Sequence, residues 1–170
     1  MAALTASTTI TSRSRGLQEQ VVVSGDTIYS GSLVGLGVGI TPGYLVPWGT
    51  GDGTTAEIAF LGLAIITVFD TDSDVLDYAI VGDGTETCPV DTSGMWILNP
   101  GADGTAISIA SVGAPVFCPN DNPDDITTDN TGAVDPIGTL MKLLSDSSDT
   151  FDCCLFTPNE AYSMRNRTGA

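Results

Sequence analysis

The chain repeats one short pattern in its two halves. In each copy a glycine begins an apolar segment, a loop rich in Gly, Asp, Asn and Thr follows, and an apolar residue followed by glycine opens a second apolar segment. The two copies are residues 29–34 with 60–64 and residues 111–116 with 136–140, and the glycines that begin their first apolar segments are Gly31 and Gly113. The repetition predicts a small β domain built from two related halves, without obvious catalytic residues in either.

Turn signals are dense, and no long stretch has the 3.6-residue period of an amphipathic helix. The chain contains 20 glycines and 9 prolines, whereas charged residues make up only 15% and the usual helix formers are scarce. We therefore predict an all-β barrel or sandwich, with a hairpin turn at 82–84 and at most one helical turn, at 107–112. The expected strands are residues 21–23, 27–29, 33–36, 44–48, 56–69, 75–81, 87–90, 95–98, 106–111, 115–118, 136–144 and 151–156.

The length of 170 residues leaves room for one domain with a proper core. An N-terminal arm is expected at residues 1–17, because this stretch is polar and has no strand pattern beyond 8–11. The β domain is predicted at 18–157, and a polar C-terminal tail at 158–170.

Charge and hydropathy argue against two classes of partner. All 21 acidic residues lie between Glu19 and Glu160, where Lys142 is the only basic residue. An acidic body repels nucleic acid and anionic membranes, so we expect neither as a partner. No secretory signal is visible, and the longest apolar run, 58–69, is too short to span a bilayer. The remaining basic residues lie in the arm and the tail and are Arg13, Arg15, Arg165 and Arg167.

The chain offers little for catalysis. It contains no histidine, the most common general acid or base at neutral pH. Lys142 is flanked by apolar residues in a strand pattern, so its side chain is expected to face solvent. Segments begun by Asp91 and Asp129 resemble the Asp-Thr-Gly of aspartic proteases, but each has an extra residue before its glycine. We predict that the protein is not an enzyme.

Metal and cofactor sites are not expected either. Asp70, Asp72 and Asp74 alternate as at the start of an EF-hand loop, but the later positions that require Gly and Glu are valines. A second oxygen-rich segment lies at 121–125, and we interpret both segments as solvated acidic turns. The cysteines form no C-x-x-C pair and are expected to be free buried thiols, with neither zinc nor a disulfide; they are Cys88, Cys118, Cys153 and Cys154.

Taken in order, five segments resemble the head decoration (capsid cement) proteins of tailed bacteriophages. They are residues 25–34 (GDTIYSGSLV), 43–47 (GYLVP), 60–64 (FLGLA), 113–117 (GAPVF) and 137–139 (IGT). The resemblance implies a small, tulip-like β-barrel that assembles as a homotrimer on the outer surface of the head. It also implies the major capsid protein as partner and stabilisation of the capsid lattice as function. Together with the lack of a visible secretory signal, it predicts synthesis in the host cytoplasm.

The N-terminal arm is the predicted contact region. Its arginines carry the charge opposite to that of the body, and we expect them to dock on acidic surface of a neighbouring protomer or of the major capsid protein. The residues before them are expected to extend along a sheet edge. The predicted interface residues are Thr8, Thr9, Ile10, Thr11, Arg13 and Arg15.

Two other classes of function stay open at this point. The first is a carbohydrate-binding β-sandwich module of a virion or secreted protein, in which aromatic side chains stack on sugar rings. Its candidate residues are Trp48, Trp96, Tyr44 and Tyr78. The second is a hydrolase that uses paired carboxylates, of which Asp91 would be one.

Overall fold

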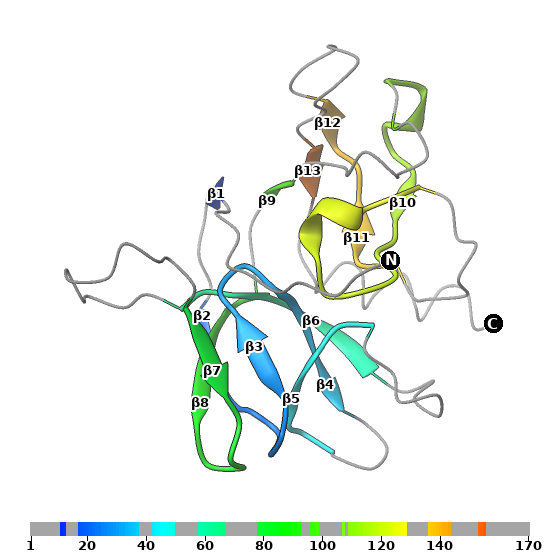
Figure 1. Ribbon diagram of the computed structural model, residues 1–170. Coiled ribbons are helices and arrows are strands. Elements are labelled where there is room, and N and C mark those ends of the chain that lie inside the picture. The colour runs from blue at the N-terminus through cyan, green and yellow to red at the C-terminus, as the bar shows by residue number, and fades with distance from the viewer. Residues whose placement is uncertain are drawn as a thin grey trace.

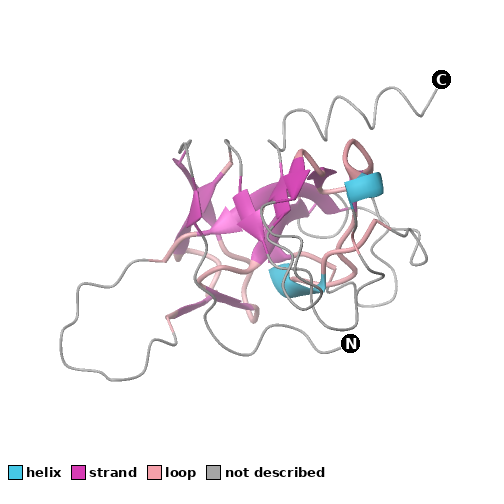
Figure 2. Ribbon diagram, turned by 90° about the horizontal axis from the view of Figure 1, so that it is seen from above, coloured by secondary structure: helices cyan, strands magenta, loops and turns pink. Residues whose placement is uncertain are grey.

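The computed structural model describes residues 11–12, 17–37, 42–49, 58–66, 78–92, 96–98, 107, 109–128, 136–143 and 153–155 (Figure 1). The strands are β1 (Thr11–Ser12), β2 (Leu17–Val21), β3 (Thr27–Tyr29), β4 (Leu33–Gly37), β5 (Leu45–Pro47), β6 (Ile58–Ala64), β7 (Ala79–Val81), β8 (Thr87–Asp91), β9 (Trp96–Leu98), β10 (Pro115–Val116), β11 (Gly138–Thr139), β12 (Lys142–Leu143) and β13 (Cys153–Leu155). The helical elements within these residues are two 3₁₀ turns, η1 (Ile109–Ser111) and η2 (Pro123–Asp125) (Figure 2). The all-β prediction is confirmed.

Five strands form the largest sheet, in the order β2-β8-β6-β4-β5. The sheet curls until its edges meet at one end, where the Val23 N–H donates to the Leu45 carbonyl at 3.1 Å and Val22 bridges Leu45 in parallel. Its concave side buries an apolar cluster, here called the sheet core, which consists of Val22, Ile28, Val34, Leu45, Ala64, Ile66, Cys88 and Val90. The strands form no closed barrel among the described residues, so the tulip-like barrel stays a prediction.

The strand pairing on either side of residues 82–84 shows that the hairpin predicted there is wrong. This turn does not connect a β-hairpin, because β7 pairs with β3 whereas β8 pairs with β2 and β6. The pairs β2/β8 and β3/β7 instead share one continuous register, and this two-stranded ribbon bends where residues 22–26 lie beside 82–86. A side chain at Gly82 would overlap the Val23 carbonyl, so glycine is required for the close approach of the two bends.

One exposed carboxylate holds this bend. Asp83 Oδ1 accepts hydrogen bonds from the N–H and the hydroxyl of Thr85, both at 2.7 Å, and from the Glu86 N–H at 3.0 Å. These hydrogen bonds, that of the Thr85 hydroxyl first, hold the pKa of the Asp83 carboxyl below its usual range. The turn signal in the sequence therefore reflects real local structure, although the strands on either side pair elsewhere.

The internal repeat predicted from the sequence is present in the structure. Gly31 and Gly113 both adopt left-handed backbone conformations, with φ of 87° and 91°. The Gly31 N–H donates to the Ala64 carbonyl at 2.8 Å, and the Gly113 N–H donates to the Leu140 carbonyl at 2.8 Å. Ala64 and Leu140 end the second segments of the two copies, so the two hydrogen bonds are equivalent.

Each copy continues into an antiparallel ladder with the same register. In the first ladder β4 pairs with β6, and Val34 lies opposite Gly62. In the second ladder β10 pairs with β11, and Val116 lies opposite Gly138. The two halves are therefore related in their glycine turn and in their strand pairing.

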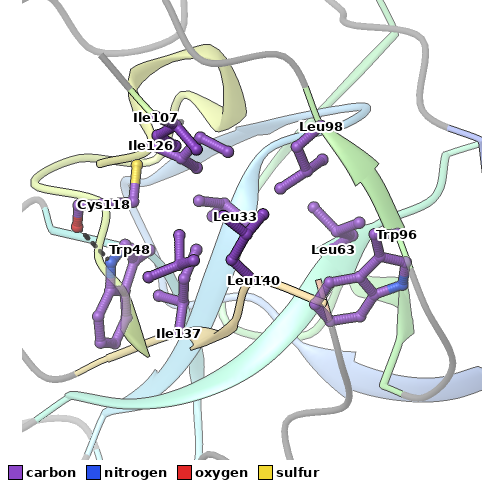
Figure 3. Close-up of a cluster of buried hydrophobic side chains, with 11 residues drawn as sticks. Leu33, Trp48, Leu63, Trp96, Leu98, Ile107, Cys118, Ile126, Ile137 and Leu140 are labelled. Carbon is purple, nitrogen blue, oxygen red and sulfur yellow. Dashed lines mark hydrogen bonds between the residues drawn. The ribbon is translucent and has the colours of Figure 1, made fainter. Parts of the chain in front are cut away.

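The two ladders share one apolar core, shown in Figure 3. Leu33 and Leu63 point into it from one face of the first ladder, and Val116 and Leu140 enter it from the second half. Val34 and Ala64 point from the other face of the first ladder into the sheet core, so this ladder has buried residues on both of its faces. This cluster, here called the central core, consists of Leu33, Trp48, Leu63, Trp96, Leu98, Ile107, Val116, Cys118, Ile126, Ile137 and Leu140.

Some element boundaries differ from those predicted. The helical turn expected within 107–112 is confirmed as η1, which replaces the strand expected at 106–111 over its described part. Strand β2 begins at Leu17, the last residue of the predicted arm, and β1 lies within that arm. The tail predicted at 158–170 lies outside the described residues.

Candidate functional site

One residue of the predicted interface lies within the described residues. Thr11 belongs to β1, which pairs antiparallel with β9 so that Thr11 lies opposite Ile97. Strand β9 also pairs with β13, so β1 of the arm and β13 near the end of the β domain lie on either side of one strand. The arm is thus joined at this point to a sheet of its own chain. The other predicted interface residues, Thr8, Thr9, Ile10, Arg13 and Arg15, lie outside the described residues.

Beneath β9 lies a buried carboxylate at the end of β8. Asp91 is fully buried, and its Oδ2 accepts a hydrogen bond of 3.4 Å from the indole N–H of Trp96. Asp129, the second carboxylate of the hydrolase hypothesis, lies outside the described residues. Lys142 is exposed, as predicted. Asp91 has no access to solvent, and its hydrogen bond with Trp96 joins the end of β8 to β9. In the described structure Asp91 therefore helps to hold these two strands together.

The four aromatic residues considered for sugar stacking occupy different environments. Trp48 and Trp96 are buried in the central core, and the Trp48 indole N–H donates to the Cys118 carbonyl at 2.8 Å. Phe60 packs its ring edge-on against both, with centroids at 5.3 Å from Trp48 and 6.1 Å from Trp96. Tyr78 packs against the sheet core, whereas Tyr44 is exposed. Both indoles therefore stabilise the fold and present no flat surface to a sugar.

The oxygen-rich segment at 121–125 is folded upon itself. Asn120 Nδ2 donates to Asp125 Oδ2 at 2.7 Å, and Asn122 Oδ1 caps η2 by accepting from the Asp124 N–H at 3.1 Å. Desolvation, and after it the charge of Asp125, raise the pKa of the Asp124 carboxyl. The Asp121 carbonyl accepts from the Leu33 N–H at 2.8 Å, which joins this loop to the first ladder.

No group of three or more His, Cys, Asp or Glu side chains is placed to hold a metal ion within the part of the chain that the structure describes. The segment that contains Asp70, Asp72 and Asp74 lies outside that part. In the described structure, residues 121–125 connect the two halves of the fold.

The thiols that the structure describes are free and buried, as predicted. Cys88 lies in the sheet core and Cys118 in the central core. Burial raises the pKa of each of these two thiols to about 12. Both therefore stay protonated at neutral pH, in which state a thiol is a poor nucleophile and a poor metal ligand. Cys153 and Cys154 lie in β13, where their backbones pair with β9 and β12.

Exposed apolar side chains form a feature that sequence reasoning missed. Val112 and Met141 expose 44% and 50% of their surfaces. The hydrogen bond from the Gly113 N–H to the Leu140 carbonyl joins their chain neighbours, so the two side chains flank one short connection beside the second ladder. A comparison of the two repeats residue by residue gives the sequence signal for this exposed surface. Pro115 of the second copy stands at the position that Leu33 occupies in the first copy.

No protein-family model, curated protein or solved structure matches the chain. Among the described residues, none of the helical elements is long and apolar enough to cross a membrane.

Proposed function

We propose that the protein is a structural decoration protein, which binds the outer surface of a tailed-phage head and stabilises the lattice of the major capsid protein. The observation that carries the proposal is the ordered resemblance of five segments to capsid decoration proteins. Those segments supply the two turn glycines and the strands of both ladders. The role requires a stable all-β body and no catalytic residue.

The distribution of charge supports this role. The formal net charge is −16, and all acidic residues except Glu160 of the tail lie in the β domain. A protein on the outside of a DNA-filled shell needs no affinity for DNA, and an acidic body is repelled by phosphates. Its attachment must therefore rest on contacts with protein.

We propose that the protein acts as a homotrimer. Three weak contacts made together by one particle give far stronger retention than any one of them alone. A capsid lattice offers repeated, equally spaced sites, so a symmetric trimer can engage several capsid subunits at once.

The arm supplies further contacts in this proposal. Its β1 segment is fixed on β9, and residues 8–10 with Arg13 and Arg15 are proposed to contact a neighbouring protomer or the major capsid protein. Exposed ion pairs contribute only about 0.2–1 kcal/mol each, so main-chain pairing must provide most of the attachment.

Deletion of residues 2–15 is expected to weaken retention on heads while the free protein stays folded. Strand β1 contributes only two residue pairs at the edge of a sheet, so we expect the melting temperature to fall by less than about 4 °C. The amount of protein that co-sediments with heads after dilution measures retention. The double substitution Arg13→Gln and Arg15→Gln retains the β1 backbone and should weaken retention by up to about fivefold per arginine. Retention of the shortened protein equal to that of the full chain would show that the arm makes no contact.

A further inference from the structure

Strand β2 has an open edge in the described structure. It pairs with β8 alone within the described ranges, and its other edge meets a strand only beyond its end, at Val22 and Val23. Leu17 is 58% exposed, and Gln18 and Glu19 are exposed as well. Successive side chains of a strand point to opposite faces, so the start of β2 is uncovered on both faces of the sheet.

The hydrogen bonds beyond the end of β2 show which backbone groups point out of this edge. The Val22 N–H donates to the Glu86 carbonyl at 2.8 Å, across the ladder with β8. The Val23 N–H points the other way and donates to the Leu45 carbonyl at 3.1 Å. Backbone groups of successive strand residues alternate between the two edges. The N–H and C=O groups that point outward from β2 are therefore those of residues 17, 19 and 21.

The C-terminal tail begins close to this open edge. Strand β13 ends at Leu155, opposite Trp96, and Ser12 of β1 lies opposite Trp96 on the other side of β9. Leu155 and Ser12 are therefore two strand spacings apart, about 10 Å. Leu17 follows Ser12 by five residues, which span at most about 18 Å, so Leu155 lies within about 28 Å of Leu17. The chain thus leaves β13 near the start of β2.

We infer that residues 163–168 of the tail dock as an extended strand on the open edge of β2 in their own chain. The residues that connect them to Leu155 span up to about 28 Å, enough to reach the start of β2. A tail that reaches this point first runs parallel to β2, which places Arg165 beside Glu19 and Arg167 beside the bend that follows β2. Such a strand satisfies the outward backbone groups and hides an edge on which other chains would pair.

Charge and composition select this segment as the occupant. Residues 163–168 (SMRNRT) contain two arginines, no acidic residue and no proline, which could not donate to a ladder. Strand β2 contains Glu19, and the bend beyond it contains Asp83 and Glu86, all exposed. Lys142, the only basic residue in the part of the chain that the structure describes, lies in another sheet. The tail therefore brings positive charge to an acidic edge.

Hydrogen exchange of backbone amides, resolved by NMR on the full chain without heads, tests the inference. The inference goes beyond the proposed function, because the docking takes place within one free chain. We expect the outward amides of Glu19 and Val21 to exchange at least about tenfold faster when residues 158–170 are deleted. The Val22 amide is the internal reference, because it donates within the sheet, and its rate should change less than about twofold. Protein concentration should not alter these rates.

Substitutions separate the tail from the arm. Arg165→Gln with Arg167→Gln should accelerate exchange of the Glu19 and Val21 amides by up to about fivefold per arginine. The matched control, Arg13→Gln with Arg15→Gln, removes the same charge from the arm and should leave these amides unchanged.

Three results would overturn the inference. They are rapid exchange of the Glu19 and Val21 amides in the full chain, unchanged exchange after the deletion, and protection that is lost on dilution, which would assign the pairing to the tail of a neighbouring copy. Protected amides in a protein that does not bind heads would refute the proposed function alone. Head binding by a protein whose outward β2 amides are unprotected would refute this inference alone.

Discussion

Replacement of Trp96 by alanine is expected to lower the free energy of unfolding by about 3–5 kcal/mol, a large part of the roughly 5–15 kcal/mol that stabilises an ordinary domain. Trp96 is fully buried and is the largest of the fully buried side chains. Its removal leaves a cavity in the central core beside Phe60. It also removes the indole N–H that donates to the buried Asp91 carboxylate at 3.4 Å, and the loss of this hydrogen bond adds to that of the cavity.

Urea unfolding followed by circular dichroism measures this loss. Trp96→Phe retains most of the ring but not the N–H, so the difference between the two variants separates the cavity from the hydrogen bond. Tyr44→Ala removes an aromatic ring that is exposed, and we expect a change of less than about 0.5 kcal/mol. A loss below 1 kcal/mol for Trp96→Ala would contradict the described central core.

The second large effect is expected from Gly62→Ala, a change of one methyl group in β6. A Cβ atom at Gly62 would overlap the backbone carbonyl of Asp91 and lie 3.0 Å from Val90 Cγ1. Backbone atoms cannot rotate away, so β6 and β8 would have to separate at this point. We expect a loss of about 3 kcal/mol, at the upper end of the range for overpacking.

Gly113→Ala is the matched comparison for this substitution, because it adds the same methyl group to a turn glycine of the repeat. The space around Gly113 is open, but its φ of 91° is strained for alanine, so a smaller loss of about 1–2 kcal/mol is expected. The same urea titration compares the two variants. A larger loss for Gly113→Ala than for Gly62→Ala would be inconsistent with the close contact between β6 and Asp91.

The parts of the fold that depend on local signals could be predicted from the sequence. The repeat was recognisable because a glycine followed by apolar residues recurs in the sequence at Gly31 and Gly113, and the structure gives both glycines a left-handed φ. Pairing partners could not be predicted in the same way. The turn at 82–84 looked like that of a hairpin, but β7 and β8 pair with β3 and β2, which depends on how distant segments share a core.

The candidate sites likewise divide into features that the local sequence predicts and features that it does not. The exposure of Lys142 and the burial of Cys88 and Cys118 followed from flanking residues and composition. The burial of Trp48 and Trp96 did not, because an aromatic residue in a strand fits either a core or a binding surface. Nor did the exposure of Val112 and Met141 beside the second ladder, which no pattern in their own segments indicated.

Binding of the purified protein to heads, compared with binding to precursor shells, tests the proposed function most directly. The proposed function places the gene for this chain in a tailed-phage genome. Mature heads of that phage, prepared with the gene deleted, would be mixed with increasing amounts of protein before sedimentation. We predict saturable binding to mature heads and none to precursor shells, because we propose that the binding sites form only when the capsid lattice matures. Absence of binding to mature heads, or equal binding to both particles, would contradict it.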